Sequence, residues 1–207
     1  MSGGPRWVER GCYARHMSNA PVRRMTSTEY LAWEREQKER HEYVHGEVFA
    51  MSGGSHRHAA LIAAVTAELV NAHRGGPCRA LSTDQRIVAQ DGEHYVYADA
   101  SVVCGRSVLA KETKDVLANP SVIVEVLSKS TEAYDRGKKW DGYQKIASVT
   151  DYVLISQSAA RIEHYQREAG GEWHYRVAEA GGRVTLKSGA LLNVDEVFRG
   201  AFELEGD

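Results

Sequence analysis

The chain has 207 residues, a formal net charge of −2 and an isoelectric point near 6.5, and 43% of its residues are hydrophobic. This length fits one domain, and this hydrophobic content excludes a disordered chain. The near-neutral charge excludes a protein that coats nucleic acid through overall basicity, but not an enzyme with a local basic surface. The sequence shows neither an apolar run that could span a membrane nor the apolar segment of a secretion signal, so we expect a cytoplasmic protein.

The three cysteines are Cys12, Cys78 and Cys104. Their number is odd, and they lack the Cys-x-x-Cys spacing that is typical of zinc sites. We therefore expect free thiols in a reducing compartment and no disulfide framework.

Residues 1–24 are rich in Gly and Arg and lack hydrophobic periodicity. We interpret them as a flexible N-terminal extension and place one folded domain over 25–207. A basic DNA-contacting tail and an over-long translation start are the alternatives for this segment. Thr26, with Glu29 three residues later, is a capping-box pattern and predicts a helix over about 28–39.

Strands and helices alternate along the rest of the chain. Two short strands (41–44 and 47–51) precede a helix over 56–73, which the sequence Gly75-Gly76-Pro77 ends. The further predicted elements, in order, are strands at 78–81, 85–89, 95–103 and 121–128, a helix at 131–147, and strands at 152–156, 161–167, 173–178 and 184–186. Glycine pairs separate the last three strands, as in a β-meander. The expected fold class is α+β: a central mixed sheet flanked by helices, with a C-terminal meander.

Two acids lie on successive strand-like runs. Asp99 lies in the run 95–104, and Glu125 interrupts the apolar residues of the run 121–128. A buried carboxylate is costly unless a cation or hydrogen bonds compensate its charge. Because two convergent carboxylates can bind Mg²⁺ or Mn²⁺ through oxygen, we assign Asp99 and Glu125 as catalytic residues and metal ligands.

The convergence of these acids depends on an assumed strand register. With Val103 opposite Val122 in an antiparallel pair, Asp99 lies opposite Val126 and beside Glu125. Neighbouring strands lie about 5 Å apart, so both carboxylates and the Val126 carbonyl could reach one metal ion. A shift of one residue would change the face that each acid uses. The alternative for Glu125 is a solvated position on an edge strand.

Lys139 lies in the helix that is predicted after Glu125. It shares a helical face with Asp135, Tyr143 and Ile146, and the last two residues indicate that this face points inward. A lysine at this place could stabilise charge on a phosphate or orient a water molecule, so we assign Lys139 as the third catalytic residue. The alternatives are an ordinary surface ion pair with Asp135 and a catalytic role for the neighbouring lysine at position 138.

The combination of these segments resembles the Uma-type endonuclease-like family, formerly a domain of unknown function, in the PD-(D/E)XK restriction-endonuclease-like superfamily. The resemblance covers about 26–202, and its segments are TSTEYLAWE (26–34), RHEYVHGEVFAMSGGSHRHAAL (40–61), YADASVV (97–103), VIVEVLSKST (122–131), DRGKKWDGY (135–143) and TDYVLISQSAARIEHYQRE (150–168). Two positions depart from the signature: Ala98 stands where a proline is usual, and Leu127 stands where the motif has its lysine. The resemblance implies that this lysine has moved to the following helix, as Lys139.

The resemblance also implies a third acid from the N-terminal part of the fold. Glu42 is the candidate metal ligand, within a pattern Glu-x-x-x-Gly-Glu that also contains Glu47. His56 and His58, at the start of a helix, are either zinc ligands beside the acids or, more ordinarily, solvated or phosphate-contacting histidines.

Together the residues and the resemblance predict a restriction-endonuclease-like core and a Mg²⁺- or Mn²⁺-dependent nuclease that hydrolyses phosphodiester bonds, with DNA as the expected substrate. A homodimer is expected, because two equivalent sites would serve the two strands of a duplex. One alternative is a non-catalytic descendant of the fold that binds nucleic acid or a protein, and another is a metal-dependent hydrolase with a different substrate.

Overall fold

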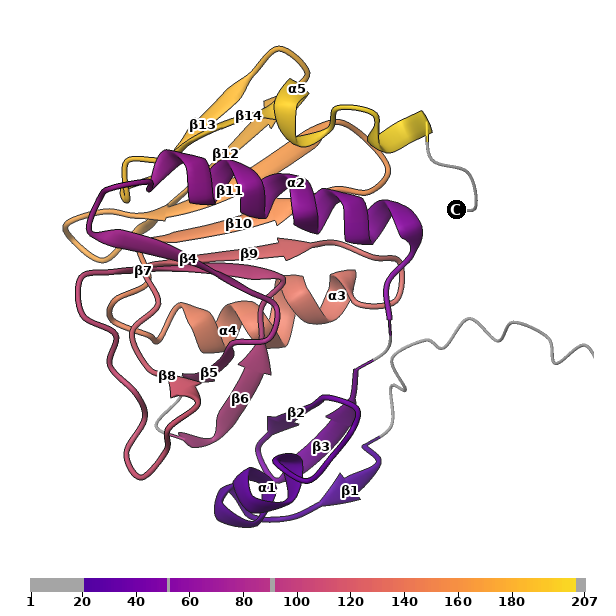
Figure 1. Cartoon of the computed structure of the whole chain (residues 1–207), viewed down its shortest axis with the longest axis vertical. Helices are drawn as coiled ribbons and strands as arrows, with labels where there is room; N and C mark the ends of the chain where they lie inside the picture. The colour runs from indigo at the N-terminus through magenta and orange to yellow at the C-terminus, as the bar shows by residue number, and fades with distance from the viewer. Residues whose placement is uncertain (1–20, 52, 90–91, 204–207) are drawn as a thin grey trace, which may run out of the picture.

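The strands of the protein form two six-stranded sheets and one small hairpin (Figure 1). The structure is a computed structural model and describes residues 21–51, 53–89 and 92–203. We call the two large sheets the lower sheet and the upper sheet after their positions in Figure 1. The candidate catalytic residues lie where the chain crosses from the lower sheet to the upper one.

The lower sheet has the strand order β1-β3-β2-β6-β5-β8. Its strands are β1 (Arg23–Arg24), β2 (His41–Val44), β3 (Glu47–Ala50), β5 (Arg86–Ala89), β6 (His94–Tyr97) and β8 (Val116–Leu117). Helix α1 (Ser27–Glu34) packs against it, with buried Tyr30 stacked on Tyr43 of β2. The predicted capping box is present: the Thr26 hydroxyl accepts from the Glu29 backbone, and the Glu29 carboxylate accepts from the Thr26 backbone.

Helix α1 is shorter than predicted, because it ends at Glu34 rather than near residue 39. The Glu34 carboxylate accepts a hydrogen bond from the His41 backbone N–H at 2.8 Å. This bond draws the chain back towards β2 and ends the helix early. Strands β1 and β8 were not predicted. Of the extension expected over 1–24, Arg23 and Arg24 form β1, and residues 1–20 lie outside the described part of the chain.

The upper sheet has the strand order β12-β11-β10-β9-β7-β4. Its strands are β4 (Cys78–Ser82), β7 (Ala100–Cys104), β9 (Val122–Val126), β10 (Asp151–Ile155), β11 (Arg161–Arg167) and β12 (Trp173–Glu179). β9 and β10 are parallel and the other pairs are antiparallel, so this is the predicted mixed sheet. The C-terminal meander predicted over 161–167, 173–178 and 184–186 is confirmed only for its first two strands, which pair as β11-β12 and continue the sheet. Its third strand pairs instead with a later strand that was not predicted, in a separate hairpin.

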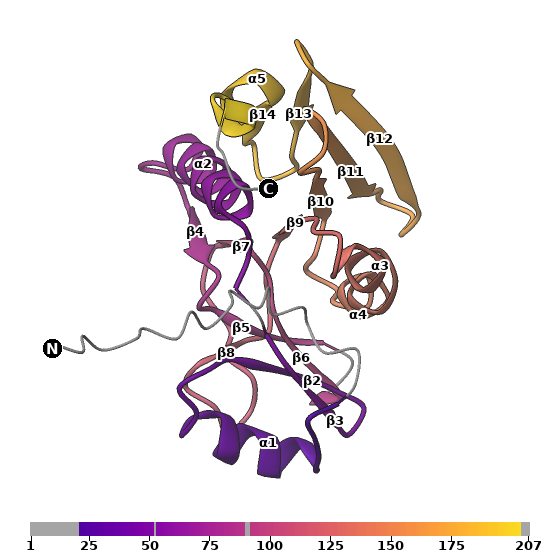
Figure 2. The ribbon, with the colours of Figure 1, turned by 90° about the vertical axis from the view of Figure 1, so that its right-hand side faces the viewer.

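Helices cover both faces of the upper sheet (Figure 2). One face packs against α2 (His56–Ala72), the hairpin of β13 (Arg183–Thr185) and β14 (Leu191–Asn193), and α5 (Val194–Val197), which η3 (Ala201–Glu203) follows. The other face packs against a continuous helical stretch of α3 (Glu132–Tyr134), η2 (Asp135–Lys139) and α4 (Trp140–Tyr143), and against the lower sheet. None of the helices in the described part of the chain is long and apolar enough to cross a membrane.

The alternation of side chains along β9 decides which way Glu125 points. Val122, Val124 and Val126 belong to the hydrophobic cluster under α2, whereas Ile123 belongs to the cluster on the opposite face. Because side chains alternate along a strand, Glu125 shares the face of Ile123 and points towards the stretch α3-η2-α4.

The strand predicted over 95–103 is divided at Ala98-Asp99, and its halves belong to different sheets. The assumed register is wrong by one residue, because Val102 and not Val103 pairs with Val122. If the register of β7 and β9 is continued by one residue beyond Ala100, Asp99 lies directly opposite Glu125.

The expectation of free thiols is wrong for Cys78 and Cys104, which form a disulfide between β4 and β7. The antiparallel register places the two residues directly opposite each other, with Cα atoms 3.9 Å apart. Sequence spacing gave no sign of this pairing, because it depends on which strands are neighbours. Cys12 lies outside the described residues.

Candidate active site

Asp99 lies in the bend between β6 and β7, where the chain leaves the lower sheet for the upper one. Its Oδ2 atom accepts a hydrogen bond of 2.7 Å from the backbone N–H of Val126, the last residue of β9. This bond fixes the Asp99 carboxylate beside the end of the strand that carries Glu125. Asp99 and Glu125 are therefore neighbours, as predicted, although the register assumed for that prediction is wrong by one residue.

Glu125 is buried, with 2% of its surface exposed. Its Oε1 atom accepts hydrogen bonds from the Tyr143 hydroxyl at 2.9 Å and from Lys139 Nζ at 3.1 Å. The solvated edge-strand alternative is wrong, because β9 lies inside the upper sheet between β7 and β10.

Lys139 is also buried, with 5% of its surface exposed. Its Nζ atom donates to the Tyr97 carbonyl at 3.1 Å and lies 3.3 Å from Glu42 Oε1 and 3.5 Å from Asp135 Oδ1. Asp135 and Lys139 are the first and last residues of η2, a π-helical turn. Such turns are often found at functional sites, because the wider turn redirects side chains. The structure confirms that the helical face of Lys139 points inward. The alternative of a surface ion pair between Asp135 and Lys139 is wrong, because both residues are buried.

The carboxylates at this site outnumber their nearby cation. Burial raises the pKa of Glu125 well above its usual range, Lys139 opposes this rise, and the charges of Asp135, Asp99 and Glu42 add to it. Burial also raises the pKa of Asp135, again against the effect of Lys139. Burial lowers the pKa of Lys139, but Glu125, Glu42 and Asp135 outweigh it, so its net pKa lies well above the usual range. The ammonium group is therefore held charged among acids that repel one another.

Glu42 lies in β2 of the lower sheet, and its side chain reaches the same cluster. Its Oε1 atom accepts from the Tyr97 backbone N–H at 3.0 Å and contacts Lys139. Tyr97 thus connects Glu42 and Lys139 through its own backbone, immediately before the Asp99 bend. Glu47, the other acid of the pattern, instead pairs with Arg24 of β1.

His58 lies in the first turn of α2, and its Nε2 atom is 3.0 Å from the Val126 carbonyl and 3.5 Å from Asp99 Oδ2. Burial opposes protonation of His58, but the hydrogen bond and charge of Asp99 outweigh it and raise the pKa of His58. His56 is exposed and lies outside the cluster. The sequence singled out His58 but did not predict this contact, because it depends on how α2 crosses the upper sheet.

The donor set suits a hard divalent cation. Asp99 and Glu125 could supply carboxylate oxygens, and His58 Nε2 lies near both the Val126 carbonyl and Asp99 Oδ2. Mg²⁺ typically uses one or two carboxylates together with water and substrate phosphate. Within the described ranges, no group of three or more His, Cys, Asp and Glu side chains is arranged to hold a metal ion. The residues present therefore fit an open centre in which two carboxylates hold the ion and water or substrate completes its ligands.

Two participants were not assigned from the sequence. Asp135 contacts Lys139, and Tyr143 donates to Glu125. The spacing of four residues from Asp135 to Lys139 and from Lys139 to Tyr143 was the available signal, since it places all three on one helical face. That signal showed a shared face but could not show which strand the face contacts.

A family model described as "Uma2: Putative restriction endonuclease" matches residues 27–205. The chain belongs to the Uma2 family. This match confirms the resemblance that the sequence segments indicated.

The chain also resembles two proteins of Synechocystis sp. over most of its length. An uncharacterized protein of Synechocystis sp. is 35% identical over 186 residues, covering 89% of this chain and 97% of the relative. A second uncharacterized protein of the same organism is 29% identical over 154 residues, covering 74% of this chain and 87% of the relative.

A solved structure from Anabaena variabilis, titled "a putative nuclease belonging to DUF820", superimposes with a TM-score of 0.70. It covers 86% of this chain and 99% of the other at 19% identity, which establishes a shared fold. The Uma2 chain thus has the α+β, restriction-endonuclease-like fold that the sequence predicted.

Proposed function

We propose that this Uma2-family protein is a metal-dependent nuclease that hydrolyses phosphodiester bonds, with DNA as its substrate and Mg²⁺ or Mn²⁺ as its cofactor. The observation that carries this proposal is the meeting of Asp99, Glu125 and Lys139 from a bend, a strand and a helix in one cluster. Family membership supports the nuclease class.

Each residue has a separate part in the proposed reaction. A divalent ion bound at such a centre polarises the phosphate and lowers the pKa of water. Asp99 and Glu125 would hold the ion, and the Val126 carbonyl is available as a further ligand. Lys139 would offset negative charge that develops on the phosphate or orient the attacking water. Tyr143 and Asp135 hold the carboxylate of Glu125 and the ammonium of Lys139 in place. We propose Glu42 as a further metal ligand, because its carboxylate contacts Lys139 and so belongs to the same cluster.

One observation favours the non-catalytic alternative. Lys139 is buried, and its ammonium already contacts Tyr97, Glu125, Glu42 and Asp135. A lysine with all these contacts has a structural role only, unless binding of substrate or metal releases its ammonium group from them. The experiment below separates the two functions.

The test is cleavage of mixed DNA and RNA substrates with Mg²⁺, with Mn²⁺ or with EDTA. We expect metal-dependent cleavage of DNA by the wild type, and no cleavage by Asp99→Ala or Lys139→Ala. Lys139→Ala should still bind the metal, because lysine acts on phosphate charge and not on the cation, whereas Asp99→Ala should lose both properties. Asp84→Ala and Lys114→Ala are the matched controls, since both side chains are exposed and their loss removes the same charges as the two test variants. A folded wild type that cleaves neither substrate with either ion would contradict the nuclease and make the non-catalytic alternative the better one.

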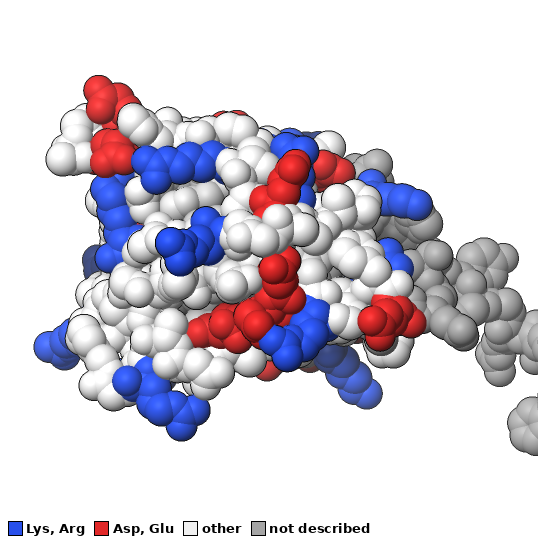
Figure 3. Space-filling model, turned by 90° about the horizontal axis from the view of Figure 1, so that it is seen from above, with Lys and Arg blue, Asp and Glu red and all other residues white. Residues whose placement is uncertain are grey.

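The proposed place of action is the cytoplasm, where the disulfide between Cys78 and Cys104 would be reduced. The upper face of the molecule, which Figure 3 shows, carries Lys and Arg interspersed with Asp and Glu. This face lacks a continuous basic surface in its described part, so contact with a nucleic-acid backbone would have to come from a local basic site.

A further inference from the structure

A pocket of about 220 Å³ lies between the lower sheet and the helical stretch that carries Lys139, and its lining includes Lys138, the neighbour of Lys139 in the chain. The turn between β2 and β3, with His45, and the start of β6, with His94, form one wall. Lys138, Asp141 and Lys145 form the other wall. Lys138 and Lys139 are adjacent in the chain, but Lys138 is exposed and lies over the Phe49 ring, whereas Lys139 is buried.

His94 is a buried residue of this pocket whose hydrogen-bonding groups are not satisfied by any described residue. It is 1% exposed, and neither of its ring nitrogens has a hydrogen-bond partner within the described ranges. A neutral imidazole has one donor and one acceptor, and leaving them unpaired in a buried place is costly. The ring fits against α4 because residue 142 is glycine: a Cβ there would lie 2.4 Å from His94 Nδ1. The fold therefore makes room for a polar ring whose nitrogens it leaves unpaired.

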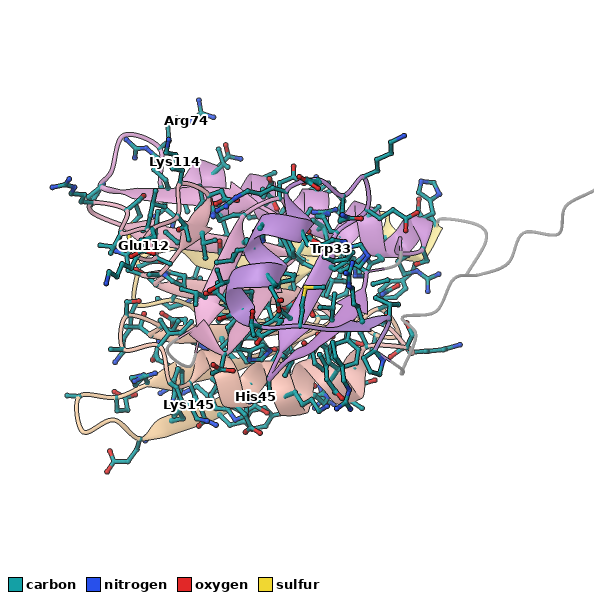
Figure 4. All side chains as sticks on the ribbon, turned by 90° about the horizontal axis from the view of Figure 1, so that it is seen from below. Trp33, His45, Arg74, Glu112, Lys114 and Lys145 are labelled. Atoms are coloured by element: carbon teal, nitrogen blue, oxygen red, sulfur yellow. A yellow bond between two sulfur atoms is a disulfide. The ribbon has the colours of Figure 1, made fainter. Side chains whose placement is uncertain are left out.

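The charges around the pocket favour an anion. Lys138 lies in η2 and Lys145 lies in the turn that follows α4, and neither side chain forms an ion pair with a described residue. Of the two acids in the walls, Glu47 is neutralised by Arg24, which leaves Asp141. Burial lowers the pKa of His94 to about 3, and the positive charges of Lys139, His45, Lys138 and Lys145 add to this effect. His94 is thus neutral, in a place that several cations face. Figure 4 shows His45 and Lys145 near each other at one edge of the molecule, away from Lys114.

We propose that this pocket is a phosphate subsite, which holds one backbone phosphate of the nucleic-acid strand that enters the candidate active site. This proposal rests on the proposed function, because the strand must pass Lys139 to be cut. The volume, smaller than the 300 to 1,000 Å³ of typical drug-sized ligand pockets, suits a phosphate group better than a larger ligand. Lys138 and Lys145 would supply charge, and His94 would supply a fixed N–H donor.

The test is the binding of labelled single-stranded and duplex oligonucleotides in EDTA, measured by fluorescence anisotropy over a range of salt concentrations. EDTA prevents metal-dependent cleavage, so the measurement reports binding alone. Lys138→Ala with Lys145→Ala should weaken binding about tenfold or more at low salt, and lower the slope of log affinity against log salt by about one to two. Lys138→Arg with Lys145→Arg should retain binding, since charge is kept. His94→Leu, which changes no charge at neutral pH, should weaken binding about fivefold, as expected for one lost hydrogen bond.

Lys111→Ala with Lys114→Ala is the matched control, because it removes the same charge from two exposed residues that do not line the pocket. The proposal is overturned if the Lys138 and Lys145 alanine pair binds as tightly as the wild type, or loses no more affinity than the control pair. A wild type that binds no oligonucleotide overturns both the subsite and the proposed function. Binding that depends on the pocket, without cleavage when metal is added, would support the subsite and contradict the nuclease activity.

Inorganic phosphate is the second probe, compared with chloride at equal ionic strength. It distinguishes a nucleic-acid phosphate from a free one. A melting temperature that phosphate raises in the wild type and not in the alanine pair, without any difference in oligonucleotide binding, would show a free-phosphate site and overturn the proposal.

Discussion

At the scale of single residues, the candidate site is a set of charges that do not balance. Glu125, Glu42 and Asp135 surround the Lys139 ammonium within 3.5 Å, and Asp99 lies at the end of the same strand pair. Burying several carboxylates around one ammonium group is costly, because each acid loses water and repels the others. Such a cluster is more readily explained as a binding site that gains a cation than as a device for stability.

We predict that millimolar Mg²⁺ or Mn²⁺ raises the melting temperature of the wild type by several degrees. A ligand that binds only the native state stabilises it by about 2.7 kcal/mol at 100 times its Kd, and each kcal/mol is roughly 2 to 4 °C for a chain of this size. Glu125→Gln should abolish the gain, whereas Glu196→Gln, at an exposed position, should keep it. The measurement is thermal unfolding with each ion and with EDTA. An equal gain in the wild type and in Glu125→Gln would contradict the metal site.

At the scale of elements, the helical stretch that carries Lys139 is held to the upper sheet by a side-chain fork. Arg136 of η2 donates two hydrogen bonds, of 2.7 and 2.8 Å, to the carboxylate of Glu163 in β11. The hydrogen bonds from Arg136 lower the pKa of Glu163, burial opposes them, and the Tyr175 hydroxyl adds to the lowering. Arg136 and Glu163 lie outside the candidate site, but their ion pair helps to hold η2, and with it Lys139, in place.

We predict that Glu163→Gln lowers the free energy of unfolding by about 1 to 2 kcal/mol at neutral pH, as for a charged hydrogen-bonded pair. Because the folded pKa of Glu163 is below the usual 4.5, this contribution is present above pH 4.5 and is lost as the pH falls through the folded pKa. The difference between wild type and variant should therefore shrink in acid. Urea titrations at neutral and acidic pH measure it, and a difference that grows in acid would show that the linkage has the opposite sign.

The disulfide between β4 and β7 allows a second test at this scale. Cys78 and Cys104 are 26 residues apart in sequence. Closing a loop of this length in the unfolded chain stabilises the fold by about 3.5 kcal/mol. We predict that a reductant lowers the melting temperature of the wild type by several degrees and does not change that of Cys104→Ser. If both proteins respond equally to the reductant, the effect does not come from this disulfide.

At the scale of the whole molecule, the edge strand β12 offers a surface for association. β12 lies at the end of the upper sheet, and its residues Tyr175 and Val177 are 48% and 41% exposed. Free strand edges pair readily with other strands unless charge or covering segments prevent it. This edge is consistent with the homodimer that is proposed for cutting both strands of a duplex.

We predict a homodimer at micromolar concentration, which Val177→Lys converts to a monomer by placing a charge at the edge. Val108→Lys, at an exposed loop position, should leave the dimer intact. Light scattering after size exclusion measures the mass of each. A wild type that is only monomeric would contradict the dimer and leave the single-site chemistry untouched.

The sequence by itself determined the local features of this protein. The Thr26 capping box, the helix near 56–73 and the α+β class follow from signals within a few residues, and the structure confirms them. Glu125 and Lys139 were identifiable for the same reason: a charge inside an apolar run, or on an inward helical face, is costly and therefore informative.

Only the tertiary structure decided what depends on which segments are neighbours. The strand register is off by one from the sequence estimate, Cys78 meets Cys104, and β6 and β7 belong to different sheets. A period-2 pattern gives the face of a strand but does not give its partner, and one buried run is compatible with several registers. The contacts that Asp135, Tyr143 and His58 make at the site, and the unpaired ring of His94, depend on packing between elements distant in sequence. The sequence could not predict these contacts, because each one needs the positions of two elements relative to each other.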